Sequence, residues 1–78
     1  MQKRKELLER FLNENFDLTQ FVVDWEDNFI VSLIDSRGEQ LDLICYDNET
    51  ICSYLEGRKF LTYRLDKDLE NNSYFRVI

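Results

Sequence analysis

Residues 29–46 read FIVSLIDSRGEQLDLICY and predict a β-hairpin. Apolar residues run through both flanks, and a polar turn containing Gly38 separates them. A three-residue loop of Ser36, Arg37 and Gly38, with Gly38 in the left-handed region, is a common connection between two antiparallel strands. We therefore expect one strand over residues 29–34 and a second over residues 41–46.

The length of the loop decides which side chains share a face of the sheet. A two-residue loop would shift the pairing by one residue and turn every side chain of one strand to the opposite face. Asp42 would then join the apolar face, so we reject that register. The three-residue loop instead gives three apolar pairs on one face: Leu33 with Leu41, Val31 with Leu43, and Phe29 with Cys45.

The segment before the hairpin has the pattern of a third strand. From Leu18 onward the apolar period is two, which is typical of a half-buried strand. Glu26, Asp27 and Asn28 form a polar turn before the next strand. Pairing across that turn predicts that Phe21, Val23 and Trp25 lie beside Leu33, Val31 and Phe29 on the same face.

Residues 3–16 predict an amphipathic helix, because their apolar residues recur at helical spacing. This stripe consists of Leu7, Leu8, Phe11, Leu12 and Phe16.

A second, short helix is predicted after the hairpin. Asp47 can cap it, Glu49 lies near the positive end of its dipole, and Gly57 ends it. Residues 60–65 and 74–78 read as two further strands, joined by a polar loop over residues 66–73.

The elements together predict an α+β fold in the order αβββαββ. An N-terminal amphipathic helix packs on a mainly antiparallel sheet of about five strands. The length of 78 residues predicts a single domain spanning residues 1–78.

The face of the sheet opposite the expected core is also partly apolar. A strand with apolar residues on both sides usually has both faces covered, here by the second helix or a curled strand. The alternative is an exposed apolar patch rimmed by acids, which would bind a protein, including a second copy in a homodimer. This face carries Val22, Ile30, Ile34, Ile44 and Tyr46, accompanied by Asp24 and Asp42.

Charge is distributed in blocks along the chain, whose net charge is −6. Residues 1–10 carry a net +2, residues 11–57 a net −10, and residues 58–78 a net +2. An acidic block of this size serves solubility, or it complements the basic surface of a partner protein. Direct contact with nucleic acid is not expected there, because phosphates are bound by Lys and Arg.

Eight residues are candidate partner contacts. The acids lie in the acidic block, and the two aromatic residues are candidate anchors, although Trp25 also fits the edge of the core. The candidates are Asp24, Trp25, Glu26, Asp27, Asp42, Tyr46, Asp47 and Glu49.

Composition argues against an enzyme. The chain has no histidine, which excludes a Ser-His-Asp or Cys-His arrangement within it. No Gly-rich phosphate loop, dinucleotide fingerprint or EF-hand loop is present. Cys45 and Cys52 do not have zinc-ligand spacing, and we expect reduced, buried thiols, with a redox disulfide as the alternative. We therefore expect no catalytic residue, no cofactor and no metal.

Hydropathy and composition together indicate a cellular context. No segment has the roughly 18 apolar residues of a membrane helix, and charges interrupt residues 3–10 where a signal peptide would be apolar. We therefore expect a cytoplasmic protein with no membrane partner. Alanine and proline are absent, which suggests an AT-rich genome such as that of a low-GC bacterium, its phage or its plasmid.

In size, acidity and α+β character, the chain is similar to small acidic proteins encoded by phages of low-GC bacteria. The anti-CRISPR proteins are an example of this class. The resemblance implies an inhibitor or regulator, including a mimic of nucleic acid, that docks an acidic face on a basic, nucleic-acid-binding partner. The alternative is a structural or assembly protein that forms a homo-oligomer through its apolar sheet face. The resemblance assigns no role to any single residue.

Overall fold

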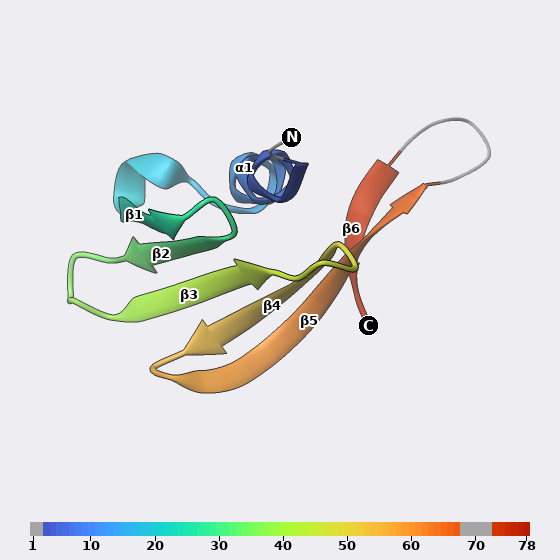
Figure 1. Cartoon of the computed structure of the whole chain (residues 1–78). Helices are drawn as coiled ribbons and strands as arrows, with labels where there is room; N and C mark the ends of the chain where they lie inside the picture. The colour runs from blue at the N-terminus through green and yellow to red at the C-terminus, as the bar shows by residue number, and fades with distance from the viewer. Residues whose placement is uncertain (1–2, 68–72) are drawn as a thin grey trace.

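A computed structural model describes residues 3–67 and 73–78. Within those residues, helix α1 (Lys3–Asn15) is followed by a short 3-10 helix, η1 (Leu18–Gln20), and by six strands. The strands pair antiparallel with their neighbours in the chain, so their order in the sheet is their order in the sequence (Figure 1). The predicted α+β class with an N-terminal helix is confirmed. The strands are β1 (Val22–Asp27), β2 (Ile30–Ile34), β3 (Gln40–Cys45), β4 (Thr50–Leu55), β5 (Arg58–Lys67) and β6 (Ser73–Val77).

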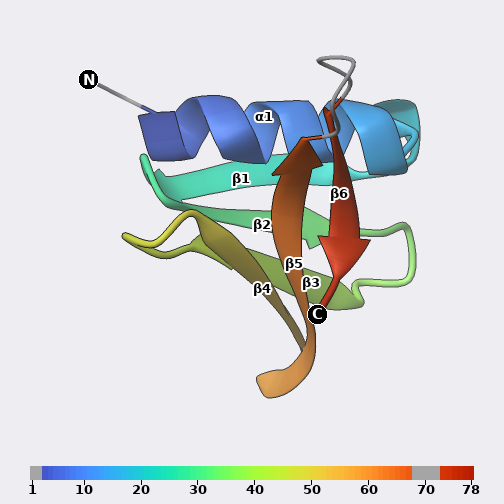
Figure 2. The same cartoon turned by 90° about the vertical axis from the view of Figure 1, so that its right-hand side faces the viewer.

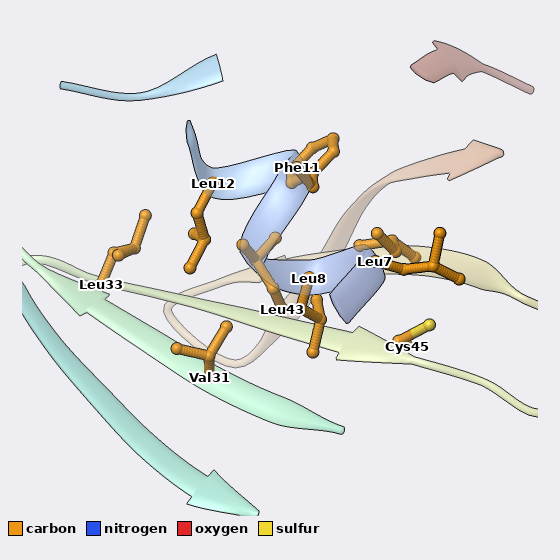
Figure 3. Close-up of a cluster of buried hydrophobic side chains, with 9 residues drawn as sticks. Leu7, Leu8, Phe11, Leu12, Val31, Leu33, Leu43 and Cys45 are labelled. Carbon is orange, nitrogen blue, oxygen red and sulfur yellow. The ribbon is translucent and has the colours of Figure 1, made fainter. Parts of the chain in front are cut away.

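The sheet curls around α1, which lies on its concave face between β1 and β6 (Figures 1 and 2). Four residues of the predicted helix stripe are confirmed as part of the core: Leu8 and Leu12 point toward β2 and β3 (Figure 3), and Phe11 packs on Tyr63 of β5 and Phe75 of β6. The helix ends at Asn15, one residue earlier than predicted, and Phe16 is half-buried against the core. Burial of this apolar area is the main stabilising term for so short a chain. The buried set is Leu7, Leu8, Phe11 and Leu12 from α1 with Val31, Leu33, Leu43, Cys45 and Ile51 from the sheet.

The β2–β3 hairpin has the predicted register, with Leu33 opposite Leu41. Gly38 has a φ of 84°, and Asp35 and Glu39 close the loop with a backbone hydrogen bond of 3.0 Å. The Asp35 carboxylate accepts hydrogen bonds from the backbone N–H groups of Glu39 and Arg37, both at 2.9 Å. Both hydrogen bonds lower the pKa of Asp35, and the bond from Glu39 has the larger effect.

The predicted pairing of β1 with β2 is wrong by two residues. Val23 lies opposite Leu33, and Trp25 lies opposite Val31. The strand runs on to Asp27, and a β-bulge between Trp25 and Asp27 takes up the extra residue. Because a shift of two residues keeps each side chain on its face, the apolar residues still face the core.

The predicted second helix is also wrong, because residues 50–55 form strand β4. Glu56 and Gly57 both have positive φ values, 51° and 80°, and they connect Leu55 to Arg58 as a two-residue hairpin turn. Gly57 is therefore a turn residue and not the end of a helix. Ile51 and Ser53 face the core, as the period of two in a strand requires.

The residues taken for a helix cap instead form the β3–β4 turn. Tyr46 donates its backbone N–H to Thr50 at 2.8 Å, and Glu49 donates to Tyr46 at 2.9 Å. Glu49 has a φ of 68°, the conformation that Gly38 adopts in the preceding hairpin.

With β4 in the sheet, the convex face is not covered by any element among residues 3–67 and 73–78. The final two strands, β5 and β6, pair as an antiparallel hairpin. Of the loop predicted at residues 66–73, positions 68–72 lie outside the described residues. In the described part, no helix is long and apolar enough to cross a membrane.

Candidate partner-binding surface

The fold converts the charge blocks of the sequence into charged regions in space. Because strand order in the sheet equals chain order, the acidic block supplies β1 to β4 and the basic C-terminal block supplies β5 and β6. Strands β1 and β6 lie at opposite ends of the sheet. Four cations of β5 and β6 are exposed: Arg58, Lys59, Arg64 and Arg76.

Three of the predicted contacts, Asp24, Glu26 and Asp27, lie on β1, and we call them the acidic edge. All three are exposed. Within the described part of the chain, none of their carboxylates takes part in an ion pair. Asp27 accepts a hydrogen bond from the backbone of Asn28 at 2.7 Å. Among residues 3–67 and 73–78, the acidic edge therefore presents three exposed carboxylates that form no ion pair.

Asp47 and Glu49, in the β3–β4 turn, are already paired with cations. Lys3 lies 2.8 Å from Glu49, and Arg4 lies 2.9 Å from Asp47. The hydrogen bond with Glu49 is the main cause that raises the pKa of Lys3. The Arg4 guanidinium also stacks over the Phe29 ring, 4.4 Å from its centroid. These two acids hold the start of α1 against the turn, where a cleft of about 460 Å³ also includes Asp27.

Asp42 lies on the convex face within a hydrogen-bonded group. Its carboxylate accepts a hydrogen bond from the hydroxyl of Ser32 at 2.6 Å and from the amide of Gln40 at 2.8 Å. Ser32 is only 2% exposed, so the carboxylate satisfies a buried hydroxyl.

Tyr46 lies on the same convex face as Asp42. Its hydroxyl is hydrogen-bonded to that of Tyr54 at 2.8 Å, and this bond is the main cause that raises the pKa of Tyr46 to about 12. Tyr54 was missed as a surface residue because it was assigned to a helix. The β-branched and aromatic residues around it were a signal for a strand.

The Trp25 side chain points to the concave side, away from the acidic edge. It is half-buried against the core, and the Lys5 ammonium lies 5.3 Å from the ring centroid. The core-edge interpretation of Trp25 is therefore confirmed. The other seven predicted contacts divide into three regions: the acidic edge, the cleft at the start of α1, and the convex face.

Cys45 and Cys52 are buried free thiols, as expected. Burial raises the pKa of Cys45 to about 11, which keeps it a neutral thiol near neutral pH. Among the residues the structure describes, no three His, Cys, Asp or Glu side chains are grouped so that they could hold a metal ion.

No protein-family model, curated protein or solved structure matches this chain. Its charge distribution, its exposed residues and its strand order are therefore the grounds on which a function can be assigned.

Proposed function

We propose that this chain is a non-catalytic binding protein that docks its acidic edge on the basic surface of a partner protein. The observation that supports this most is the set of three exposed carboxylates, Asp24, Glu26 and Asp27, which form no ion pair in the part of the chain that the structure describes. The partner is a nucleic-acid-binding protein, and the carboxylates take the place of phosphates. We place the protein among cytoplasmic inhibitors or regulators of the phage type, similar to anti-CRISPR proteins.

The other predicted acids are weaker candidates because each already has a partner within the chain. A cation that approached Asp47 or Glu49 would have to displace Arg4 or Lys3. A cation that approached Asp42 would compete with Ser32. The acidic edge needs no such exchange, so charge complementarity there speeds encounter and selects the partner.

Capture from a lysate of a low-GC bacterium tests this proposal. The bait is compared with two double variants that raise the net charge equally from −6, Asp24→Lys with Glu26→Lys and Glu6→Lys with Glu9→Lys. All four acids are exposed, and the second pair lies on α1. Asp27 is left intact because it also bonds the β1–β2 turn.

We expect the wild type and the α1 variant to recover the same basic protein at about 50 mM salt. The β1 variant should lose at least nine-tenths of it. Raising the salt to about 0.5 M should release it from all baits, because screening shortens the range of surface charges. Equal loss in the two variants would mean that net charge matters and the position of the acids does not, which contradicts the proposal.

A second candidate function is assembly through the convex face, favoured by the absence of a covering element in the described residues. Val22 is 64% exposed and Tyr46 is 40% exposed on this face. Half-buried Ile30, Ile34 and Ile44 extend the apolar surface. In the same experiment, recovery of the bait alone, as an oligomer that persists at high salt, would favour this function.

A further inference from the structure

Strand β1 is an open edge of the sheet, because its one neighbour is β2 in the described part of the chain. An edge strand has backbone N–H and C=O groups that no neighbouring strand satisfies. Which residues expose these groups follows from the hydrogen bonds of β2, because residues along a strand bond alternately to the two sides.

The backbone on either side of β2 fixes this alternation. Phe29 accepts a hydrogen bond from Cys45 at 2.9 Å, and Asp35 donates one to Glu39 at 3.0 Å. Phe29 and Asp35 therefore bond toward the β3 side. By alternation, Val31 and Leu33 also bond toward β3, and the residues between them bond toward β1.

The partners of Val31 and Leu33 on β1 are Trp25 and Val23. Neither partner can therefore exchange hydrogen bonds with β2. Their N–H and C=O groups point to the open edge, whereas those of Val22 and Asp24 are used by β2. Val23 and Trp25 together supply two donors and two acceptors at the spacing that an added strand requires.

We infer that β1 accepts an extended, basic segment of the partner protein as an additional strand of the sheet. This inference rests on the proposed function and states how the acidic edge is used. Backbone hydrogen bonds to Val23 and Trp25 would hold the segment, and cations on alternate residues would face the carboxylate of Asp24. Strand addition of this kind takes affinity from the backbone and specificity from alternate side chains.

The acids of β1 also decide which strand can bind. A second copy of β1 would bring Asp24, Glu26 and Asp27 against the same three acids, and like charges on paired strands repel. A strand with Lys or Arg on the convex side would meet opposite charges instead. On the concave side it would lie beside half-buried Val23 and Trp25, with the Lys5 ammonium above the indole. An uncharged residue suits that side.

A defined peptide tests the inference without a natural partner. The probe is a nine-residue peptide of alternating Lys and Thr with blocked ends. Trp25 is the one tryptophan of the chain, and its backbone faces the open edge, so its fluorescence reports binding. Two further peptides of the same charge carry N-methyl groups on one or the other alternate set of residues, which removes the N–H groups along one side.

We expect the unmodified peptide to bind, and one of the two N-methylated peptides to bind at least tenfold more weakly. A Glu-Thr peptide should not bind, and the Asp24→Lys, Glu26→Lys variant should lose at least tenfold in affinity for the lysine peptide. The Glu6→Lys, Glu9→Lys variant should keep its affinity within about threefold.

Three results would overturn strand addition by a segment of the partner protein. Equal binding by all three lysine peptides would leave docking by charge intact and remove the backbone pairing. If the unmodified peptide did not bind while lysate capture still depended on the β1 acids, docking by charge would stand and strand addition would be wrong. A dissociation constant that rises with protein concentration would assign the edge to a second copy of the chain. Failure of the proposed function is recognised separately, by lysate capture that does not depend on Asp24 and Glu26.

Discussion

Replacement of Phe11 by alanine is expected to lower the free energy of unfolding by about 3–5 kcal/mol, the range for a fully buried phenylalanine. Phe11 is 2% exposed. Its ring centroid lies 4.7 Å from that of Tyr63 and 5.1 Å from that of Phe75. These contacts join α1 to β5 and β6, so their loss also loosens the curl of the sheet. A chain of this length has a total stability of about 4–12 kcal/mol, so the variant would be close to unfolding.

Phe60 provides the matched control for this prediction. It is 61% exposed on β5, and the same substitution there should cost less than about 1 kcal/mol. Urea denaturation followed by circular dichroism measures both variants. If Phe60→Ala destabilised the chain as much as Phe11→Ala, the aromatic contacts of α1 would not be the ones that hold the sheet.

The second large effect is expected at Ser53, a buried residue on the core face of β4. Its hydroxyl donates to the carbonyl of Leu61 at 3.1 Å and accepts from the N–H of Leu61 at 3.0 Å. The pairing of β4 with β5 is interrupted between Cys52 and Tyr54, so Ser53 satisfies backbone groups that the strands leave unpaired. Ser53→Ala should therefore cost about 2–4 kcal/mol, because two buried polar groups lose their partner.

Ser36→Ala makes the same chemical change at an exposed position of the β2–β3 turn. It should alter the stability by less than about 0.5 kcal/mol. Thermal unfolding of the two variants, compared with the wild type, is sufficient to distinguish them. A melting temperature of Ser53→Ala within about 2 °C of the wild type would show that water or a shift of β5 replaces the hydroxyl.

The β2–β3 hairpin was predictable because its information is local. Gly38 supplies the positive φ of the loop, and only one register keeps Asp42 off the apolar face. The stripe of α1 was predictable for the same reason, since residues at helical spacing share one face. The register of β1 against β2 was harder to predict, because a bulge after Trp25 is not apparent in the apolar pattern.

The error at residues 47–57 arises from two signals that serve two structures equally well. A polar run such as residues 47–50 can cap a helix or form a hairpin turn, and a glycine such as Gly57 can end a helix or complete a turn. What decides between them is the strand on either side: β3 and β5 both pair with β4. Such long-range pairing cannot be inferred from the local sequence.

The candidate site was likewise predictable where the information is local and not where it depends on long-range contacts. The acidity of residues 11–57 was evident, but its neutralisation at Glu49 and Asp47 depends on cations from the other end of the chain, Lys3 and Arg4. The acidic edge differs from Asp47 and Glu49 because none of its three carboxylates forms an ion pair within the described residues.

Amide hydrogen exchange along β1 in the free protein tests most directly whether this edge is open. The account predicts an alternating pattern, in which the N–H groups of Val23 and Trp25 exchange at least tenfold faster than those of Val22 and Asp24, which β2 protects. Equal protection of all four amides in dilute solution would contradict the account, because the edge would already be covered and closed to a partner strand.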